Sequence, residues 1–226
     1  MIPVVTIDGP SGAGKGAITH KLAKALGFHI LDSGALYRLI GLSARQKGIS
    51  FKAEKELAQL ARELNVNFIP TDDPQEPLKV ELDGQDVTLK IRSDEAGSDA
   101  SFIAPLKLVR EAIRGLQRDF MTEPGLIADG RDMGTVVFTD AIIKIYLTAS
   151  AEARAERRYK QLKDKGISVS LHALFHSIQE RDDRDMNRKV APLIPATDAH
   201  VIDSTGIDID EVFRQVLLIV KGKLSG

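Results

Sequence analysis

The chain has 226 residues, of which 43% are hydrophobic, so it is long enough for one large domain with a substantial core. Its formal net charge of -1 excludes a general electrostatic attraction to nucleic acid or anionic membranes, and its lack of cysteine excludes disulfides and thiolate metal sites. Neither a targeting segment nor an apolar run of membrane-spanning length is visible, and we therefore expect a cytoplasmic protein that binds neither membrane nor nucleic acid.

Short apolar runs alternate with amphipathic helical stretches along the chain. Residues 4–7 predict a buried strand, and Ile18, Leu22 and Leu26 then recur along one helix face that stops at Gly27. Further apolar runs predict strands at 29–31, 125–130, 141–149 and 199–204. Because near-continuous apolar strands separated by helices are typical of a parallel sheet, we predict an α/β fold: a five-stranded parallel sheet with helices on both faces.

The stretch 64–99 breaks this rhythm. It contains "VNFIP" and then two runs that alternate between apolar and polar residues on either side of an Asp83-Gly84 turn. The apolar positions are Leu78, Val80 and Leu82 before the turn, and Val87, Leu89 and Ile91 after it. We predict a small three-stranded antiparallel sheet inserted into the α/β domain.

A glycine-rich turn, "GPSGAGK" at 9–15, follows the first strand and fits the phosphate-binding pattern G-x-x-x-x-G-K. Glycines let backbone N–H groups turn inward around a phosphate, and Lys15, at the exposed start of the next helix, can reach the terminal phosphates. Gly16 and Ala17 stand where a standard P-loop has a hydroxyl residue that touches Mg²⁺. A plain strand-to-helix turn is the alternative, but the strand before and the amphipathic helix after it favour the phosphate site. The motif alone leaves ATPases, GTPases and kinases open.

A carboxylate ends the predicted strand "GLIADG". Asp129 stands at the carboxyl end of that strand, where it would orient Mg²⁺ or its waters, and Arg131 and Asp132 follow directly. Such a carboxylate could compensate for the hydroxyl that is missing after Lys15. The alternative is a polar loop whose acids cap a helix.

Arginines gather on two predicted helices in the second half of the chain. The first carries Arg154, Arg157 and Arg158, and the second carries Arg181, Asp185 and Arg188 on one face. The planar fork of arginine suits phosphates, and an acid among arginines suits a ribose hydroxyl. A solvated, salt-bridged helix face is the alternative.

The motifs together resemble bacterial cytidylate kinases over nearly the whole chain: "GPSGAGKG", "LDSGALYR", "REAIRGLQRDF", "LIADGRDMGTVVFTDA", "RRYKQLKDKG" and "ERDDRDMNRKVAPL" occur in that family's order. The resemblance implies a P-loop nucleoside monophosphate kinase fold and an enzyme that transfers the γ-phosphate of ATP to CMP or dCMP. It also implies Mg²⁺ with ATP, a monophosphate-binding insertion at 64–99, a mobile lid at about 153–167, and a monomer. Glycine after the P-loop lysine is normal in this group, whereas Ala17 stands where threonine is usual.

The resemblance further implies a role for each site residue. The donor phosphates would lie on Gly9, Pro10, Ser11, Gly12, Ala13, Gly14, Lys15, Gly16 and Ala17. The cytosine end of the acceptor would face Ser33, Ser101, Arg110 and Asp132. The acceptor phosphate would bind Arg38 and Arg131, and the acceptor ribose would bind Arg181 and Asp185. Arg188 would also reach the acceptor nucleotide. Catalysis would use Lys15, Arg131, Asp129, Arg157 and Arg158, with the two lid arginines closing over the donor and Asp129 holding the metal through water.

Three alternatives differ in what they require. A GTPase needs a guanine-reading N-K-x-D, which the sequence lacks. A shikimate- or gluconate-type kinase would carry a hydroxyl after the P-loop lysine and no large insertion. A non-catalytic nucleotide sensor would bind ATP without turning over any acceptor, and an ADP-release assay distinguishes it.

Overall fold

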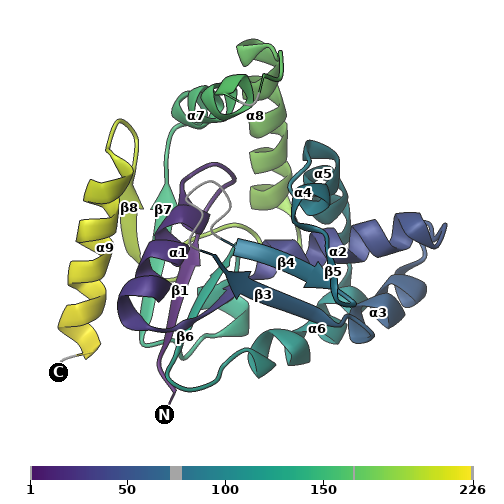
Figure 1. The fold of residues 1–226 in the computed structure, drawn as a ribbon, viewed down its shortest axis with the longest axis horizontal. Helices are drawn as coiled ribbons and strands as arrows, with labels where there is room; N and C mark the ends of the chain where they lie inside the picture. The colour runs from purple at the N-terminus through teal and green to yellow at the C-terminus, as the bar shows by residue number, and fades with distance from the viewer. Residues whose placement is uncertain (1, 72–77, 165, 225–226) are drawn as a thin grey trace.

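The central sheet of the computed structural model, which describes residues 2–71, 78–164 and 166–224, has five parallel strands (Figure 1). Their order across the sheet is β2 (His29–Asp32), β6 (Leu126–Gly130), β1 (Val4–Asp8), β7 (Ile143–Thr148) and β8 (His200–Asp203). Every neighbouring pair runs parallel. The predicted parallel sheet is confirmed, and its strands end at one common edge.

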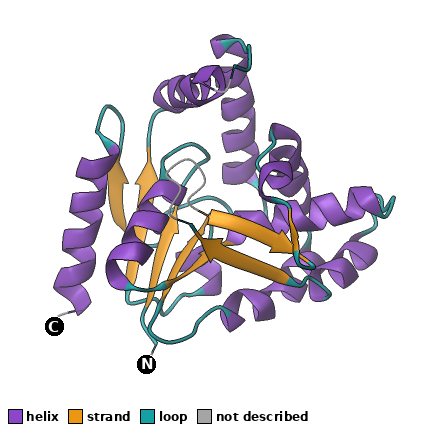
Figure 2. Cartoon of the chain, viewed as in Figure 1, coloured by secondary structure: helices purple, strands orange, loops and turns teal. Residues whose placement is uncertain are grey.

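Helices cover both faces of this sheet (Figure 2). On one face lie α1 (Lys15–Leu26) and α9 (Ile209–Leu224), whose buried residues share a core with β1 and β7. On the other lie α2 (Ser33–Gln46) and α6 (Lys107–Asp119), with α3 (Glu54–Arg62) packed outside them. The predicted helix face is confirmed, because Ile18 and Leu22 are fully buried and α1 ends at Gly27. None of the described helices is long and apolar enough to cross a membrane.

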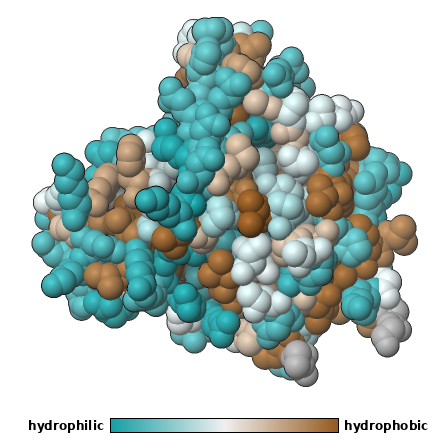
Figure 3. Space-filling view, turned by 180° about the vertical axis from the view of Figure 1, so that it is seen from behind, coloured by the Kyte–Doolittle hydropathy of each residue, from teal (hydrophilic) through white to brown (hydrophobic). Residues whose placement is uncertain are grey.

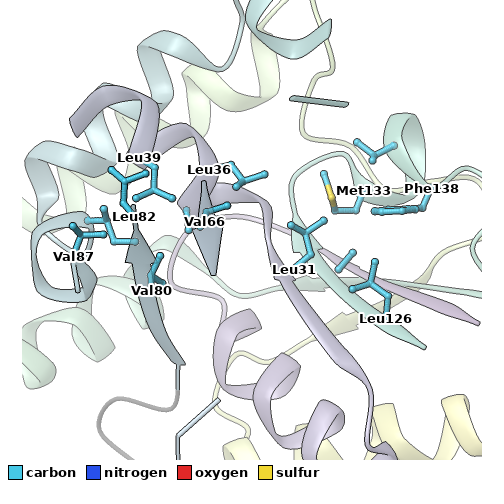
Figure 4. Packing of buried hydrophobic residues seen from close by; sticks show 14 of the residues in the cluster. Leu31, Leu36, Leu39, Val66, Val80, Leu82, Val87, Leu126, Met133 and Phe138 are labelled. Carbon is cyan, nitrogen blue, oxygen red and sulfur yellow. The ribbon is translucent and has the colours of Figure 1, made fainter. Parts of the chain in front are cut away.

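The insertion forms a second, antiparallel sheet of β3 (Val66–Pro70), β4 (Leu78–Leu82) and β5 (Gln85–Asp86). Its apolar side continues the core of the main domain: Leu36 and Leu39 of α2 belong to one cluster with Val66, Val80 and Leu82 of the insertion and Leu31 of the sheet (Figure 4). The predicted three-stranded sheet is therefore confirmed. Positions 72–77 of the predicted insertion lie outside the described residues.

The prediction that Val87 to Ile91 form a strand is wrong. The strand stops after two residues, and the chain turns into the short helix α4 (Thr88–Ile91), followed by α5 (Asp94–Ile103). Asp86 ends the strand, because its Oδ1 accepts hydrogen bonds from both the backbone N–H and the hydroxyl of Thr88. Val87 and Ile91 are buried and Leu89 is 68% exposed, a pattern that a helical turn produces and a strand does not.

Two helices project from the carboxyl edge of the sheet: α7 (Ala151–Asp164) and α8 (Leu171–Asn187) (Figure 1). Their outer surface is largely hydrophilic (Figure 3). A buried ion pair between Arg154 and Asp182 joins them, and Arg154 also donates to the carbonyls of Ala149 and Ser11. This arginine therefore ties the predicted lid, whose position 165 lies outside the described residues, to the glycine-rich turn.

Arg154→Ala is expected to lower the free energy of unfolding by about 3–5 kcal/mol, because it leaves the carboxylate of Asp182 buried without its partner. Denaturant titration measures the loss. As a control, Asp94→Ala breaks an exposed pair with Arg158 on the same helix α7 and should leave stability nearly unchanged. Equal effects of the two substitutions would show that burial of the Arg154 pair does not matter.

Candidate active site

The glycine-rich turn lies at the carboxyl edge of the sheet, between β1 and α1, and its backbone depends on glycine at both ends. Gly9 has φ 149°, and a Cβ there would lie 1.9 Å from the carbonyl oxygen of Leu147. Gly14 has φ 96° at the N-cap of α1. The turn can therefore pass close to β7 and present the first N–H groups of α1 to an anion.

Lys15 and Asp129 face each other inside this edge, with 4.0 Å between Nζ and Oδ1. The expectation that Lys15 is exposed is wrong: it is 7% exposed, and its Nζ donates to the carbonyl of Pro10 at 3.0 Å. Burial and the charge of Arg131 lower the pKa of Lys15 to about 8, while burial raises the pKa of Asp129 to about 6. A buried cation next to a buried carboxylate is suited to a polyphosphate with its metal ion.

The residues around Asp129 fit a magnesium ion held mainly through water. Asp129, Asp32, Gly16 and Thr19 line a cavity of about 180 Å³, which leaves room for several waters. The hydroxyl of Thr19 is buried and has no hydrogen-bond partner among the described residues. Mg²⁺ is usually bound by one or two carboxylates together with waters and substrate phosphates, which is a demand that Asp129 could meet.

The charges of Arg131 and Arg181 act on Lys15, and Asp185 is paired with Arg131. Arg131 Nε donates to Asp185 Oδ2 at 2.9 Å, and Arg181 Nη1 donates to the Ser11 hydroxyl at 3.3 Å. Burial and the neighbouring charge of Arg131 lower the pKa of Arg181 to about 9. This density of positive charge is what an anionic ligand would neutralise.

The prediction that Arg188 shares a helical face with Arg181 and Asp185 is wrong. Helix α8 ends at Asn187, and Arg188 has extended backbone with its Nε donating to the carbonyl of Ala191. The chain leaves the helix here and turns back, with Leu193 N donating to the carbonyl of Asp185. Arg188 still lies near the predicted acceptor residues, because the charges of Asp132 and Asp185 act on it.

A second buried group surrounds Asp132, the residue that follows Arg131 in the chain. Arg110 donates to Asp132 Oδ2 and to the hydroxyl of Tyr37, the latter at 3.1 Å. Ser33 Oγ accepts from Gln117 at 2.9 Å. The hydroxyl of Ser101 is buried and has no partner among the described residues. These side chains supply both donors and acceptors in a region without bulk water.

The remaining predicted residues lie on the borders of this space. Arg157 donates to Ser204, which in turn contacts the carbonyl of Ala13 in the glycine-rich turn. Arg158 is paired with Asp94 of the insertion at 2.8 Å. Arg38 donates to the carbonyl of Ile91 at 2.7 Å, and burial and Arg131 lower its pKa. The two arginines of the predicted lid therefore make different contacts, Arg157 next to the glycine-rich turn and Arg158 with the insertion.

Comparison with known proteins identifies the family. The family model described as cytidylate kinase matches residues 5–222. Cytidylate kinases of Shewanella amazonensis and Shewanella baltica are 56% and 54% identical over 223 residues, 99% of this chain and 96% of each relative. The chain belongs to the cytidylate kinase family. A solved structure of an uncharacterized protein from Eubacterium ventriosum, 9% identical with TM-score 0.51 and covering 97% of this chain and 98% of its own, shows the fold alone.

Membership of this family makes the chain an ATP-dependent kinase, and phosphorylation of CMP or dCMP by ATP is the reaction of cytidylate kinases. Sequence reasoning missed Tyr37, Gln117 and Asp8, each of which is buried against a predicted residue or its loop. Asp8 had a usable signal: like Asp129, it is an acid at the carboxyl end of a central strand.

Proposed function

We propose that this edge of the sheet transfers the γ-phosphate of ATP to the phosphate of CMP or dCMP. The observation that carries the proposal is the position of Arg131. Its guanidinium bonds Asp185 and acts electrostatically on Lys15 and Arg38. It therefore links the lysine of the glycine-rich turn to two residues that we assign to the acceptor, Asp185 and Arg38.

The division of roles follows from that arrangement. The P-loop from Gly9 to Ala17 would hold the donor phosphates, with Lys15 at the terminal ones. Arg38 and Arg131 would hold the acceptor phosphate, and Arg181 and Asp185 the ribose. Ser33, Ser101, Arg110 and Asp132 would surround the base, and Arg188 would also reach the acceptor nucleotide. Each role is the one that its charge and hydrogen-bonding capacity allow.

Catalysis in this site would consist of alignment and charge neutralisation. The attacking oxygen of the acceptor phosphate is already anionic, so no side chain has to act as a covalent nucleophile. Lys15, Arg131, Arg157 and Arg158 would stabilise the charge that spreads over the transferred group. Asp129 would hold Mg²⁺ through water, and the ion would supply positive charge next to the donor phosphates.

Water must be excluded from the transfer, since otherwise ATP would be hydrolysed. We assign this task to the lid at about 153–167 and to the insertion at 64–99, which meet through the Arg158–Asp94 pair. The same proposal treats the enzyme as a cytoplasmic monomer.

A coupled assay of ADP release tests the function directly. Purified protein with ATP and Mg²⁺ is offered CMP, dCMP, UMP, AMP, GMP and shikimate in turn. We expect turnover with CMP and dCMP above all others. ATP binding without turnover of any acceptor would instead indicate a nucleotide sensor, and turnover of shikimate a metabolite kinase.

Asp185→Ala is expected to raise the KM for CMP about 10- to 100-fold while leaving the KM for ATP nearly unchanged, because a buried charge-assisted hydrogen bond to the acceptor is lost. Steady-state kinetics with each substrate varied separately measures the two constants. Asp183→Ala, an exposed acid on the same helix, is the matched control and should change neither. Loss of ATP affinity with an unchanged KM for CMP would place Asp185 on the donor side.

A further inference from the structure

The helical turn that follows Asp132 is capped in an unusual way. Asp132 occupies the N-cap position of η1 (Met133–Val137), a single turn of π-helix, yet its side chain makes no capping hydrogen bond. An aspartate at this position ordinarily accepts from the N–H groups of the first turn. Here its carboxylate turns away and pairs with Arg110, which is buried with it. The start of η1 must therefore be satisfied by another group.

That group is the carboxylate of Asp8, at the end of β1 and more than a hundred residues earlier. Its Oδ1 accepts from Met133 N at 2.9 Å and its Oδ2 from Gly134 N at 2.8 Å. Asp8 is 5% exposed, and burial raises its pKa to about 7. The single carboxylate of Asp8, on β1, thus accepts hydrogen bonds from both amides at the start of η1.

The fit between the two segments is close. A Cβ at Gly134 would lie 2.9 Å from the hydroxyl of Thr6, which precedes Asp8 on the same face of β1. The first turn of η1 is therefore pressed against β1, where water cannot replace a lost partner. If Asp8 were absent, two buried N–H groups would need an acceptor, and the carboxylate nearest in sequence is that of Asp132.

We propose that Asp8 is a positioning residue for base selectivity: it caps η1 so that Asp132 stays on Arg110 and faces the acceptor base. This inference rests on the proposed role of Asp132 in reading cytosine. Asp8 itself touches neither substrate. Asp8 holds the loop in place, and because it accepts from the amides of Met133 and Gly134, the Asp132 carboxylate does not have to cap them.

Comparison of CMP and UMP as acceptors tests the inference. In Asp8→Ala we expect the ratio of kcat/KM for CMP to that for UMP to fall at least about tenfold, the factor that one buried hydrogen bond supplies. Asp8→Asn keeps one acceptor and should recover part of the ratio. Thr6→Val is the matched control, because it alters the same face of β1 without touching the cap, and it should leave the ratio unchanged. A purely structural Asp8 would lower the thermal midpoint, and would lower CMP and UMP turnover by the same factor.

A crystal structure of Asp8→Ala separates this inference from the proposed function. We expect the Asp132 carboxylate to have moved from Arg110 to the amides of Met133 and Gly134. If Asp132 remains on Arg110 while Asp132→Ala abolishes selectivity, the role of Asp8 is refuted and that of Asp132 stands. If Asp132 has moved and the ratio is nevertheless that of the wild type, base reading by Asp132 is refuted, and the selectivity role of Asp8 with it.

Discussion

Lys15→Ala is expected to lose at least about 10³-fold in kcat, because it removes a lysine that faces both Asp129 and the expected donor phosphates. Comparable charge contacts in phosphoryl transfer have effects of that size. The ADP-release assay at saturating ATP and CMP measures the loss.

Two further variants separate charge from packing. Lys15 is buried, so alanine also removes an apolar stem, whereas Lys15→Met keeps the stem and removes only the charge. Both should lose activity alike while remaining folded by circular dichroism. Lys21→Ala, on the same helix but exposed and paired with Asp210, should retain normal turnover. Near-normal turnover of Lys15→Met would remove the lysine from the reaction.

The central sheet could be predicted from the sequence because its signal is local. Each strand is a short apolar run, and α1 shows its apolar period and its glycine stop within one stretch of the chain. The position of Asp129 followed from the same rule, since carboxyl ends of parallel strands share one edge. Patterns of this kind need no knowledge of which segments meet in space.

The errors arose where two local patterns compete. Val87 and Ile91 are four residues apart, a spacing that suits both an alternating strand and one turn of helix. The Asp86–Thr88 hydrogen bonds decide for the helix, and they involve side chains that the apolar pattern ignores. Arg188 was misplaced for a related reason, because charged spacing alone does not show where a helix ends.

The pairings of the site could not be predicted at all from spacing. Arg110 and Asp132 lie on different elements, and the caps of η1 come from β1. The sequence could name acidic and basic residues with suitable chemistry. Which acid pairs with which base depends on how β1, β6 and α6 pack against one another. The buried state of Lys15 has the same origin, since several elements close over the first turn of α1.

Wild-type enzyme is expected to prefer CMP over UMP by as much as roughly 10⁴-fold, because the pocket is polar and buried. Cytosine presents an amine donor and a ring-nitrogen acceptor, whereas uracil presents a carbonyl and an N–H. Asp132, which is 3% exposed, can accept from the amine, and Arg110 can donate to the ring nitrogen. Uracil would set acceptor against acceptor and donor against donor, so the buried groups would be left unpaired.

Asp132→Ala should therefore erode this preference chiefly by losing CMP activity, and the measurement is kcat/KM for both acceptors in wild type and variant. Because both acceptors are compared on one sample, any loss of folded protein cancels from the ratio. Asp132→Asn is a more specific second variant. Because its amide can donate a hydrogen bond to the uracil carbonyl, UMP turnover should rise relative to CMP turnover. If Asp132 merely stabilises the loop that carries it, CMP and UMP turnover will fall by the same factor in Asp132→Ala. An unchanged ratio in both variants would remove Asp132 from base recognition and leave selectivity to Ser101 and Arg110.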